Sequence, residues 1–155
     1  MIFSGIIWNA AYEYSGEILS DISCKYKILS VQPYNMGENY QKFVKDIYQF
    51  DNMPDFRLNA KIEAMQKFQS TNIVFIDIDI PNLTKEFMPR KQRYTFIQVE
   101  QLKDFIRKKY SNFVKPYFFD IIFHMTDTEA ERQNLSEVIS RYNQYKIKNN
   151  NSKEK

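Results

Sequence analysis

Cysteine, histidine and glycine are scarce in this chain, and each scarcity excludes a class of functional site. The 155 residues include one cysteine and one histidine, so no disulfide within the chain and no zinc site built from several such ligands can form. With three glycines, the chain lacks the glycine-rich loops that cradle phosphates after a strand. A nucleophile elbow and a recognisable cysteine–histidine pair are missing as well.

Long apolar runs are also absent, and the charge is nearly balanced. No apolar stretch approaches the ~18–20 residues that cross a bilayer, and residues 2–8 lack the basic flank of a signal peptide. We therefore expect a soluble, cytoplasmic protein with no membrane contact. A single cysteine, Cys24, fits a reducing compartment. We expect its side chain to be buried as a small apolar group. Twenty-two Lys and Arg stand against nineteen Asp and Glu, which is too even to indicate nucleic-acid binding.

Aromatic residues, in contrast, are abundant. Thirteen Phe and eleven Tyr bring the aromatic fraction to 16%, enough for a substantial apolar core in a chain of this length. We expect a single domain over residues 1–146 and a disordered polar tail over residues 147–155.

The periodicity of apolar residues predicts alternating strands and helices. The predicted strands cover residues 3–8, 25–34, 72–80 and 117–125, and the predicted helices cover residues 10–23, 40–50, 56–68, 97–110 and 129–145. This order predicts an α/β fold with a small four-stranded mixed or mostly parallel sheet flanked by about five helices. Residues 81–96 lack periodicity and are expected to form a long loop, of the kind that often serves as a lid or binding loop.

Two aspartates, Asp77 and Asp79, lie two residues apart in the third predicted strand. Alternate residues of a strand project from one face, which places both carboxylates on the same side, about 6–7 Å apart. Such a pair can hold Mg²⁺ or Mn²⁺ and bridge it to substrate phosphates, so we predict a metal site at Asp77 and Asp79. An exposed strand face carries the same apolar–acidic alternation, and the pattern does not separate the two interpretations.

The single histidine, His124, comes at the end of the last predicted strand and just before a helix. A helix N-terminus attracts anions and lowers the pKa of a nearby imidazole. A neutral imidazole acts as an acid or base near neutral pH, and we predict that His124 and Asp127 are catalytic. The competing interpretation is a structural histidine, with Thr126 and Asp127 acting only as helix caps.

Basic residues gather in the aperiodic segment 81–96. We predict that Arg90, Lys91 and Arg93 bind an anionic small-molecule substrate, because Arg forks onto phosphate oxygens; a solvated loop is the alternative. Asn9 joins this predicted substrate-binding set, since ligands of open α/β sheets gather beyond the carboxyl ends of the strands; it is also the expected N-cap of the first helix. Four basic residues of the next helix are expected on its solvent face: Lys103, Arg107, Lys108 and Lys109.

Asp120 and Trp8 lie in predicted strands, and we expect both to have structural roles. Asp120 interrupts an apolar strand, where a carboxylate must be paired, metal-bound or protonated. We expect an ion pair with a neighbouring basic side chain. Trp8 is expected in the core rather than on a ligand.

Three functions follow from these residues and stay open. The candidate site predicts a small transferase that acts on a nucleotide or another phosphate-bearing substrate, with Mg²⁺ or Mn²⁺ held by the two aspartates. The alternative is a non-catalytic protein-interaction module within a larger assembly, which the aromatic surplus favours. A nucleic-acid binder is disfavoured by the balanced charge, because phosphate contacts supply most of that affinity.

Overall fold

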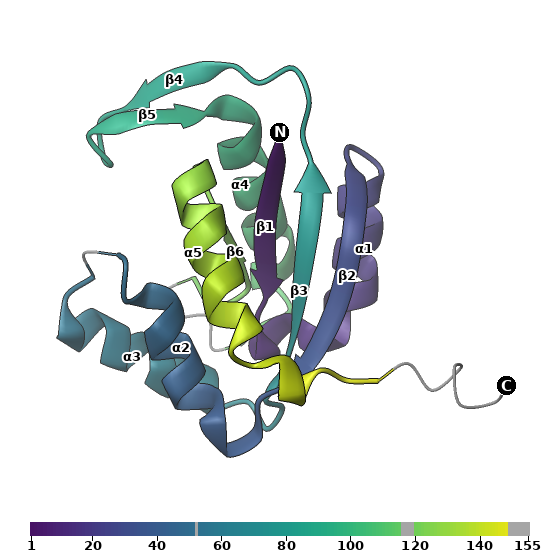
Figure 1. Ribbon diagram of the computed structural model, residues 1–155, viewed down its shortest axis with the longest axis vertical. Coiled ribbons are helices and arrows are strands. Elements are labelled where there is room, and N and C mark those ends of the chain that lie inside the picture. Colours follow the sequence, from purple (N-terminus) through teal and green to yellow (C-terminus); the bar gives the residue numbers. More distant parts are fainter. Residues whose placement is uncertain (52, 116–119, 149–155) are drawn as a thin grey trace, which may run out of the picture.

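A four-stranded antiparallel sheet in the order β2-β3-β1-β6 forms the centre of the structure (Figure 1). The computed structural model describes residues 1–51, 53–115 and 120–148. The central strands are β1 (Ile2–Ile7), β2 (Lys27–Asn35), β3 (Asn72–Asp79) and β6 (Phe123–Met125). A second sheet is a hairpin of β4 (Lys85–Met88) and β5 (Arg93–Phe96).

Five α-helices within the described residues surround the central sheet. They are α1 (Ser15–Ser23), α2 (Tyr40–Tyr48), α3 (Asp55–Gln66), α4 (Ile97–Ser111) and α5 (Glu129–Ser140). Short 3-10 helices cover Asn9–Tyr14, Gly37–Asn39 and Asn143–Tyr145. Helices α1 and α4 lie behind the sheet in Figure 1, and α5 crosses in front of it, with α2 and α3 forming a hairpin at its lower end. The domain is therefore an α/β domain, as its alternating periodicity predicts.

The expectation of a mostly parallel sheet is wrong, because every pairing in the central sheet is antiparallel. Strand β1 pairs with both β3 and β6 antiparallel, and β3 pairs with β2 antiparallel. It follows that β1 runs parallel to β2 and β3 runs parallel to β6, as helical crossovers require. The crossover from β1 to β2 passes over β3, and the crossover from β3 to β6 passes over β1. In both cases the strand that is passed over runs in the opposite direction.

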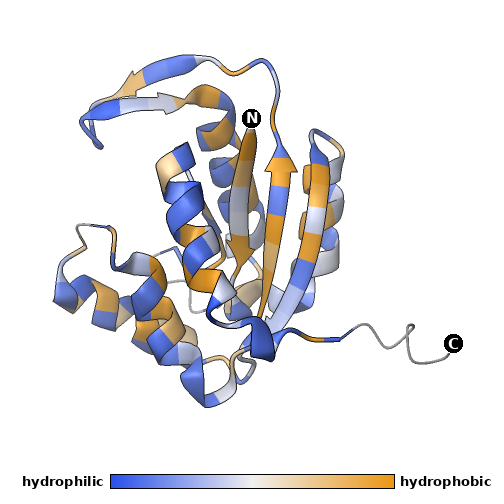
Figure 2. Cartoon of the chain, viewed as in Figure 1, coloured by the Kyte–Doolittle hydropathy of each residue, from blue (hydrophilic) through white to orange (hydrophobic). Residues whose placement is uncertain are grey.

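The alternating pattern of β3 produces one buried face and one mixed face. Val74, Ile76 and Ile78 are buried, as predicted, whereas Asp77 and Asp79 on the other face are half-buried. Figure 2 shows this alternation as apolar residues interrupted by polar ones along the strand. Trp8 follows β1 and is fully buried, which confirms its place in the core.

Residues 85–96 form the β4–β5 hairpin instead of the expected long loop. The two strands pair only with one another, from Lys85 opposite Phe96 to Met88 opposite Arg93. Most of their side chains keep partial exposure, so the sequence carries no inside–outside alternation and gives no strand signal. Gln92 in the turn has a positive φ of 53°, a conformation that the tight reversal needs.

Three details depart from the prediction: the role of Asn9, the burial of Cys24 and the start of the C-terminal tail. Asn9 does not cap a helix, because the chain first forms the 3-10 turn and the Asn9 amide bonds elsewhere. Thr128 does cap α5, with its hydroxyl accepting the Glu131 N–H. Cys24 is exposed rather than buried. Ile147, predicted to belong to the tail, donates its N–H to the Pro33 carbonyl, and residues 149–155 lie outside the described chain.

The fourth predicted strand is much shorter than expected. Strand β6 covers only Phe123–Met125, at the end of the predicted range 117–125. Residues 121 and 122 precede it as buried, non-strand backbone, and Trp8 N–H donates to the Ile122 carbonyl at 2.9 Å. Residues 117–119 of the predicted strand lie outside the described residues.

Candidate functional site

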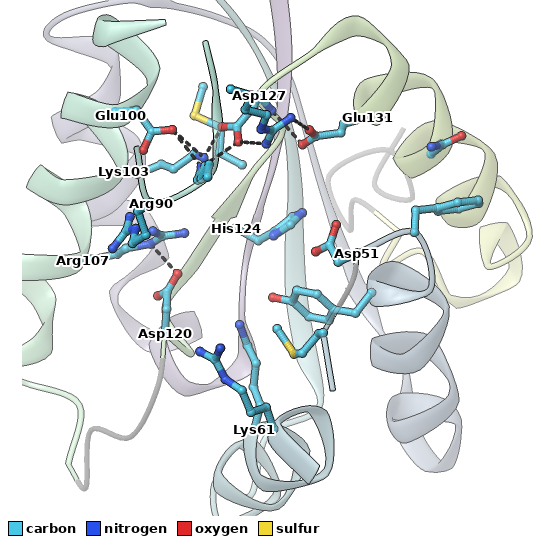
Figure 3. A pocket seen from close by; sticks show the side chains of 18 of the residues that line it. Asp51, Lys61, Arg90, Glu100, Lys103, Arg107, Asp120, His124, Asp127 and Glu131 are labelled. Atoms are coloured by element: carbon cyan, nitrogen blue, oxygen red, sulfur yellow. Dashed lines mark hydrogen bonds and ion pairs between the residues drawn. The ribbon is translucent and has the colours of Figure 1, made fainter. Parts of the chain in front are cut away.

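A highly charged pocket of about 860 Å³ opens where α3, α4, β6, α5 and the β4–β5 turn meet (Figure 3). Seven basic side chains line it, against five carboxylates, which leaves an excess of two positive charges. The basic residues are Arg57, Lys61, Arg90, Lys91, Arg93, Lys103 and Arg107, and the acidic ones are Asp51, Glu100, Asp120, Asp127 and Glu131. A concave site with this charge favours an anionic ligand.

His124 lies at the centre of this pocket, on β6 (Figure 3). Pairing of β6 with β1 sets His124 opposite Ile6 and fixes the face from which the imidazole projects. The ring of Tyr48 packs edge-on against the imidazole at a centroid distance of 5.4 Å, and Trp8 lies 6.4 Å away. Among the described residues, no side chain or backbone group hydrogen-bonds to the imidazole, so its nitrogens are available to a ligand.

The protonation state of His124 follows from its surroundings. Burial lowers the pKa of the imidazole, and the positive charges of Lys61, Lys103 and Arg107 lower it further, to about 3. The imidazole is therefore neutral at physiological pH, with a lone pair on one nitrogen. A neutral imidazole facing an anion-binding pocket has the properties of a nucleophile or a general base.

Asp127 anchors the pocket wall. Its carboxylate accepts hydrogen bonds from Lys91 Nζ at 2.8 Å, from Arg93 Nη2 at 2.7 Å and from Lys103 Nζ. Burial alone would raise the pKa of Asp127, but Lys103 and Lys91 lower it to about 2. The ionised carboxylate pairs with basic side chains of both the β4–β5 hairpin and α4, and so holds these two elements together beside His124.

The basic side chains of the hairpin also form ion pairs with two glutamates in the outer part of the pocket. Arg93 bridges from Asp127 to Glu131 Oε2 at 2.9 Å, and Lys91 bridges from Asp127 to Glu100 Oε1 at 3.0 Å. The turn between β4 and β5 places Arg90 in the lining of the same pocket. The predicted residues Arg90, Lys91, Arg93, His124 and Asp127 thus come together in one site.

Asn9 lies outside the site and serves the fold. Its amide nitrogen donates to the Met65 and Ser70 carbonyls at 2.9 and 2.8 Å, and its oxygen accepts the Tyr40 hydroxyl. This ties the end of α3 to the turn after β1. The side chain is buried and has no free polar group toward the pocket.

Asp77 and Asp79 also lie away from the pocket. Asp77 accepts the Ser4 hydroxyl at 2.6 Å and the Ser30 hydroxyl at 3.2 Å, and Asp79 accepts the N-terminal ammonium at 3.2 Å. Strand β1 separates β3 from β6, so two strand spacings of roughly 4.8 Å lie between the aspartates and His124. Within the described ranges, no group of three or more His, Cys, Asp or Glu side chains is arranged to hold a metal.

Several pocket residues escaped prediction, among them Tyr48, Lys61, Lys103 and Arg107. The expectation that Lys103 and Arg107 face solvent is wrong. Lys103 is 4% exposed, while Arg107 pairs with Asp120 and donates to the Phe123 carbonyl at 3.1 Å. The pairing with Arg107 confirms the expected ion pair for Asp120.

A signal for the buried lysines was present in the sequence. Lys103 comes four residues after Val99 and three before Ile106, inside the apolar stripe of α4. Lys61 likewise comes three residues after Leu58 and four before Met65 on α3. A basic residue inside an apolar stripe faces the interior, where it needs a partner or a function.

The fold and the pocket together define a class, an α/β domain with an antiparallel sheet and a highly charged pocket beside β6. No protein-family model matches the chain, and no curated protein matches its sequence. Its fold is nonetheless shared with solved nucleoside diphosphate kinases. The Aquifex aeolicus enzyme is 13% identical, with a TM-score of 0.53 over 89% of this chain and 93% of that one. The Borrelia burgdorferi enzyme, in a transition-state mimic with bound vanadate and ADP, is 14% identical, with a TM-score of 0.51 over 99% and 95%.

Proposed function

We propose that this chain is a nucleotide phosphotransferase in which His124 accepts the transferred phosphoryl group. One observation carries the proposal: a neutral imidazole, without a hydrogen-bond partner among the described residues, opens into a pocket lined by seven basic side chains. The neutral imidazole supplies the attacking lone pair, and the basic side chains supply charge for the phosphates. The shared fold of the nucleoside diphosphate kinases supports a nucleotide as the substrate.

The proposed reaction has two balanced half-reactions. A nitrogen of His124 attacks the terminal phosphorus of a nucleoside triphosphate, the bond from phosphorus to the bridging oxygen breaks, and the nucleoside diphosphate leaves with that electron pair. A terminal phosphate oxygen of a second nucleoside diphosphate then attacks the same phosphorus. The phosphorus–nitrogen bond breaks, and the imidazole recovers its lone pair.

The basic side chains serve this chemistry by electrostatics. Phosphoryl transfer spreads negative charge over the equatorial oxygens and the leaving oxygen, and positioned cations stabilise that charge. Arg90 at the hairpin turn and Arg107 on α4 lie on one side of His124, and Lys61 points in from α3 (Figure 3). Together they can contact the phosphates without disturbing the Asp127 anchor.

A divalent metal on Asp77 and Asp79 does not fit this site. Both carboxylates lie outside the pocket lining and bind groups of the protein itself. No step of the proposed reaction therefore uses a metal held by the described residues, and any Mg²⁺ would arrive with the nucleotide phosphates.

The proposal is tested by a transfer assay. Purified protein is incubated with ATP labelled at the γ-phosphate and with an unlabelled nucleoside diphosphate, and the label is followed into the new triphosphate. The expected result is transfer by the wild type and no transfer by His124→Gln, with Arg132→Gln on α5, outside the pocket lining, as the matched control. If the wild type binds nucleotide but transfers no phosphoryl group, the protein is a nucleotide-binding module and the proposed catalysis is refuted.

A further inference from the structure

Lys61 is a buried lysine that forms no ion pair with a carboxylate of the described residues. The side chain is 6% exposed and lines the pocket from α3. Within the part of the chain that the structure describes, no carboxylate oxygen lies within 4.0 Å of its Nζ. The ammonium instead lies over the ring of Tyr48, 4.5 Å from the centroid.

The surroundings of Lys61 disfavour its charged form. Burial lowers the pKa of the amine, and the positive charges of Arg107 and Arg57 lower it as well. The resulting pKa is about 8. Asp120 and Asp51 act in the opposite direction but do not compensate for burial. The titratable and charged groups that face Lys61 are Tyr48 of α2, Asp51 after it, Arg57 of α3, Arg107 of α4, and Asp120 and His124 in and before β6.

A buried amine without a counter-ion is a cost to the fold. An unbranched apolar side chain of similar length would fill the same space without the desolvation penalty. Residues that lower stability in this way collect at functional sites, where a ligand offsets the penalty. Lys61 and His124 line the same pocket and both contact the ring of Tyr48, so an anion that reaches the imidazole comes close to the Lys61 ammonium.

We propose that Lys61 contacts the phosphoryl group at His124 and takes up a proton as that anion enters the pocket. The inference rests on the proposed function for the identity of the anion, a nucleoside polyphosphate. Phosphate oxygens at hydrogen-bond distance from Nζ stabilise the ammonium form, so anion binding and protonation of Lys61 favour one another. The affinity for the anion should therefore fall as the pH rises above 8.

Calorimetric titration with ADP tests this linkage directly. At pH 8.5 the phosphates of ADP are fully ionised, so a proton taken up from the buffer on binding is bound by the protein and not by the nucleotide. Titrations in two buffers with different ionisation enthalpies give the number of protons. We expect an uptake of roughly 0.7 proton per ADP by the wild type. Lys61→Met should bind at least about tenfold more weakly without uptake, and Lys61→Arg should keep affinity without uptake.

Two controls keep the test decisive. Lys67→Met changes an exposed lysine at the end of the same helix and should behave as the wild type. Lys61→Met should be at least as stable as the wild type in thermal unfolding, because it removes a buried charge. Proton uptake that persists in Lys61→Met, or ADP binding by the wild type without uptake, would overturn the inference.

The outcomes also separate this inference from the proposed function. Lys61-dependent proton uptake without any phosphoryl transfer would retain the role of Lys61 in anion binding and refute the catalytic proposal. Transfer through His124 at an unchanged rate in Lys61→Met would retain the catalytic proposal and refute the role of Lys61. A wild type that fails to bind ADP would refute both.

Discussion

The ring of Tyr48 packs edge-on against the imidazole of His124, with an interplanar angle of 75° and a centroid distance of 5.4 Å. Tyr48 ends α2, whereas His124 belongs to β6, so this contact joins the helical hairpin to the sheet at the centre of the pocket. The same Tyr48 ring supports Lys61 from its face. One aromatic side chain therefore positions both groups that we propose to meet the phosphoryl group.

The packing role of Tyr48 predicts different effects for two substitutions. Tyr48→Phe keeps the ring, so its transfer rate should stay within about threefold of the wild type. Tyr48→Leu removes the edge contact and the support for Lys61, and misplacement of a reacting group by about 1 Å costs up to 10²-fold in rate. The transfer assay at saturating ATP distinguishes the two variants. Equal rates in Tyr48→Leu and Tyr48→Phe would contradict a positioning role for the ring.

His124 should remain neutral far below the pH at which an ordinary histidine protonates. Burial and the neighbouring cations hold the pKa of His124 near 3, so the first half-reaction should not slow between pH 7.5 and pH 5.5 because of this residue. The chain has a single histidine, and its imidazole proton signals in NMR can be followed through the titration without assignment. A midpoint near 6.5 would show that the pocket does not suppress protonation.

The same shift in the pKa of His124 predicts a pH-dependent stability. In the unfolded chain the imidazole has a pKa of about 6.5 and binds a proton more tightly than in the fold. The free energy of unfolding should therefore fall as the pH falls below 6.5, by about 1 to 2 kcal/mol at pH 5 from this residue. Denaturant unfolding at pH 7.5 and pH 5, compared between the wild type and His124→Gln, isolates this contribution. Equal pH dependence in both proteins would argue against it.

Asp127 should matter more for stability than its neighbours on α5. Asp127→Asn leaves the buried ammonium of Lys103 with only the Glu100 carboxylate, at 3.5 Å, and breaking a buried ion pair in this way costs about 3 kcal/mol. Glu129→Gln at the start of α5 removes only an exposed pair with Arg132 and should cost less than about 0.5 kcal/mol. Chemical denaturation of both variants measures the difference.

The loss of Asp127 should also release the β4–β5 hairpin. Lys91 and Arg93 both lose their bonds to the Asp127 carboxylate, so limited proteolysis should cut the hairpin turn faster in Asp127→Asn than in Glu129→Gln. Equal cleavage in the two variants would show that Asp127 does not hold the hairpin in place.

The sequence predicts the elements of this fold better than their arrangement. Apolar periodicity identifies the α/β class and the buried side of β3, because burial of one face follows directly from the residue pattern. It does not identify the antiparallel order, since the crossovers that skip a strand leave no local signal. The β4–β5 hairpin is missed for a related reason: its strands pair with each other outside the main sheet and keep both faces partly exposed.

The candidate site was predicted in part. His124, Asp127 and the basic residues of the hairpin follow from residue chemistry at strand and loop ends, and they meet in one pocket. The metal site at Asp77 and Asp79 stays a prediction from strand spacing; both residues lie outside the pocket, and Asp77 accepts hydrogen bonds from Ser4 and Ser30. The place of Lys61 inside the apolar stripe of α3 indicates that the side chain is buried, but the stripe does not reveal that it lines the same pocket as His124.

The central claim is that His124 carries the phosphoryl group, and trapping of that intermediate tests it most directly. Wild-type protein is mixed with γ-labelled ATP in the absence of an acceptor, denatured at high pH and analysed by intact mass and by peptide mapping. The account predicts one phosphoryl group per chain, stable in base and labile in acid as a phosphorus–nitrogen bond should be, located on His124 and absent from His124→Gln. No label on the wild type, or label that persists in His124→Gln, would contradict the account.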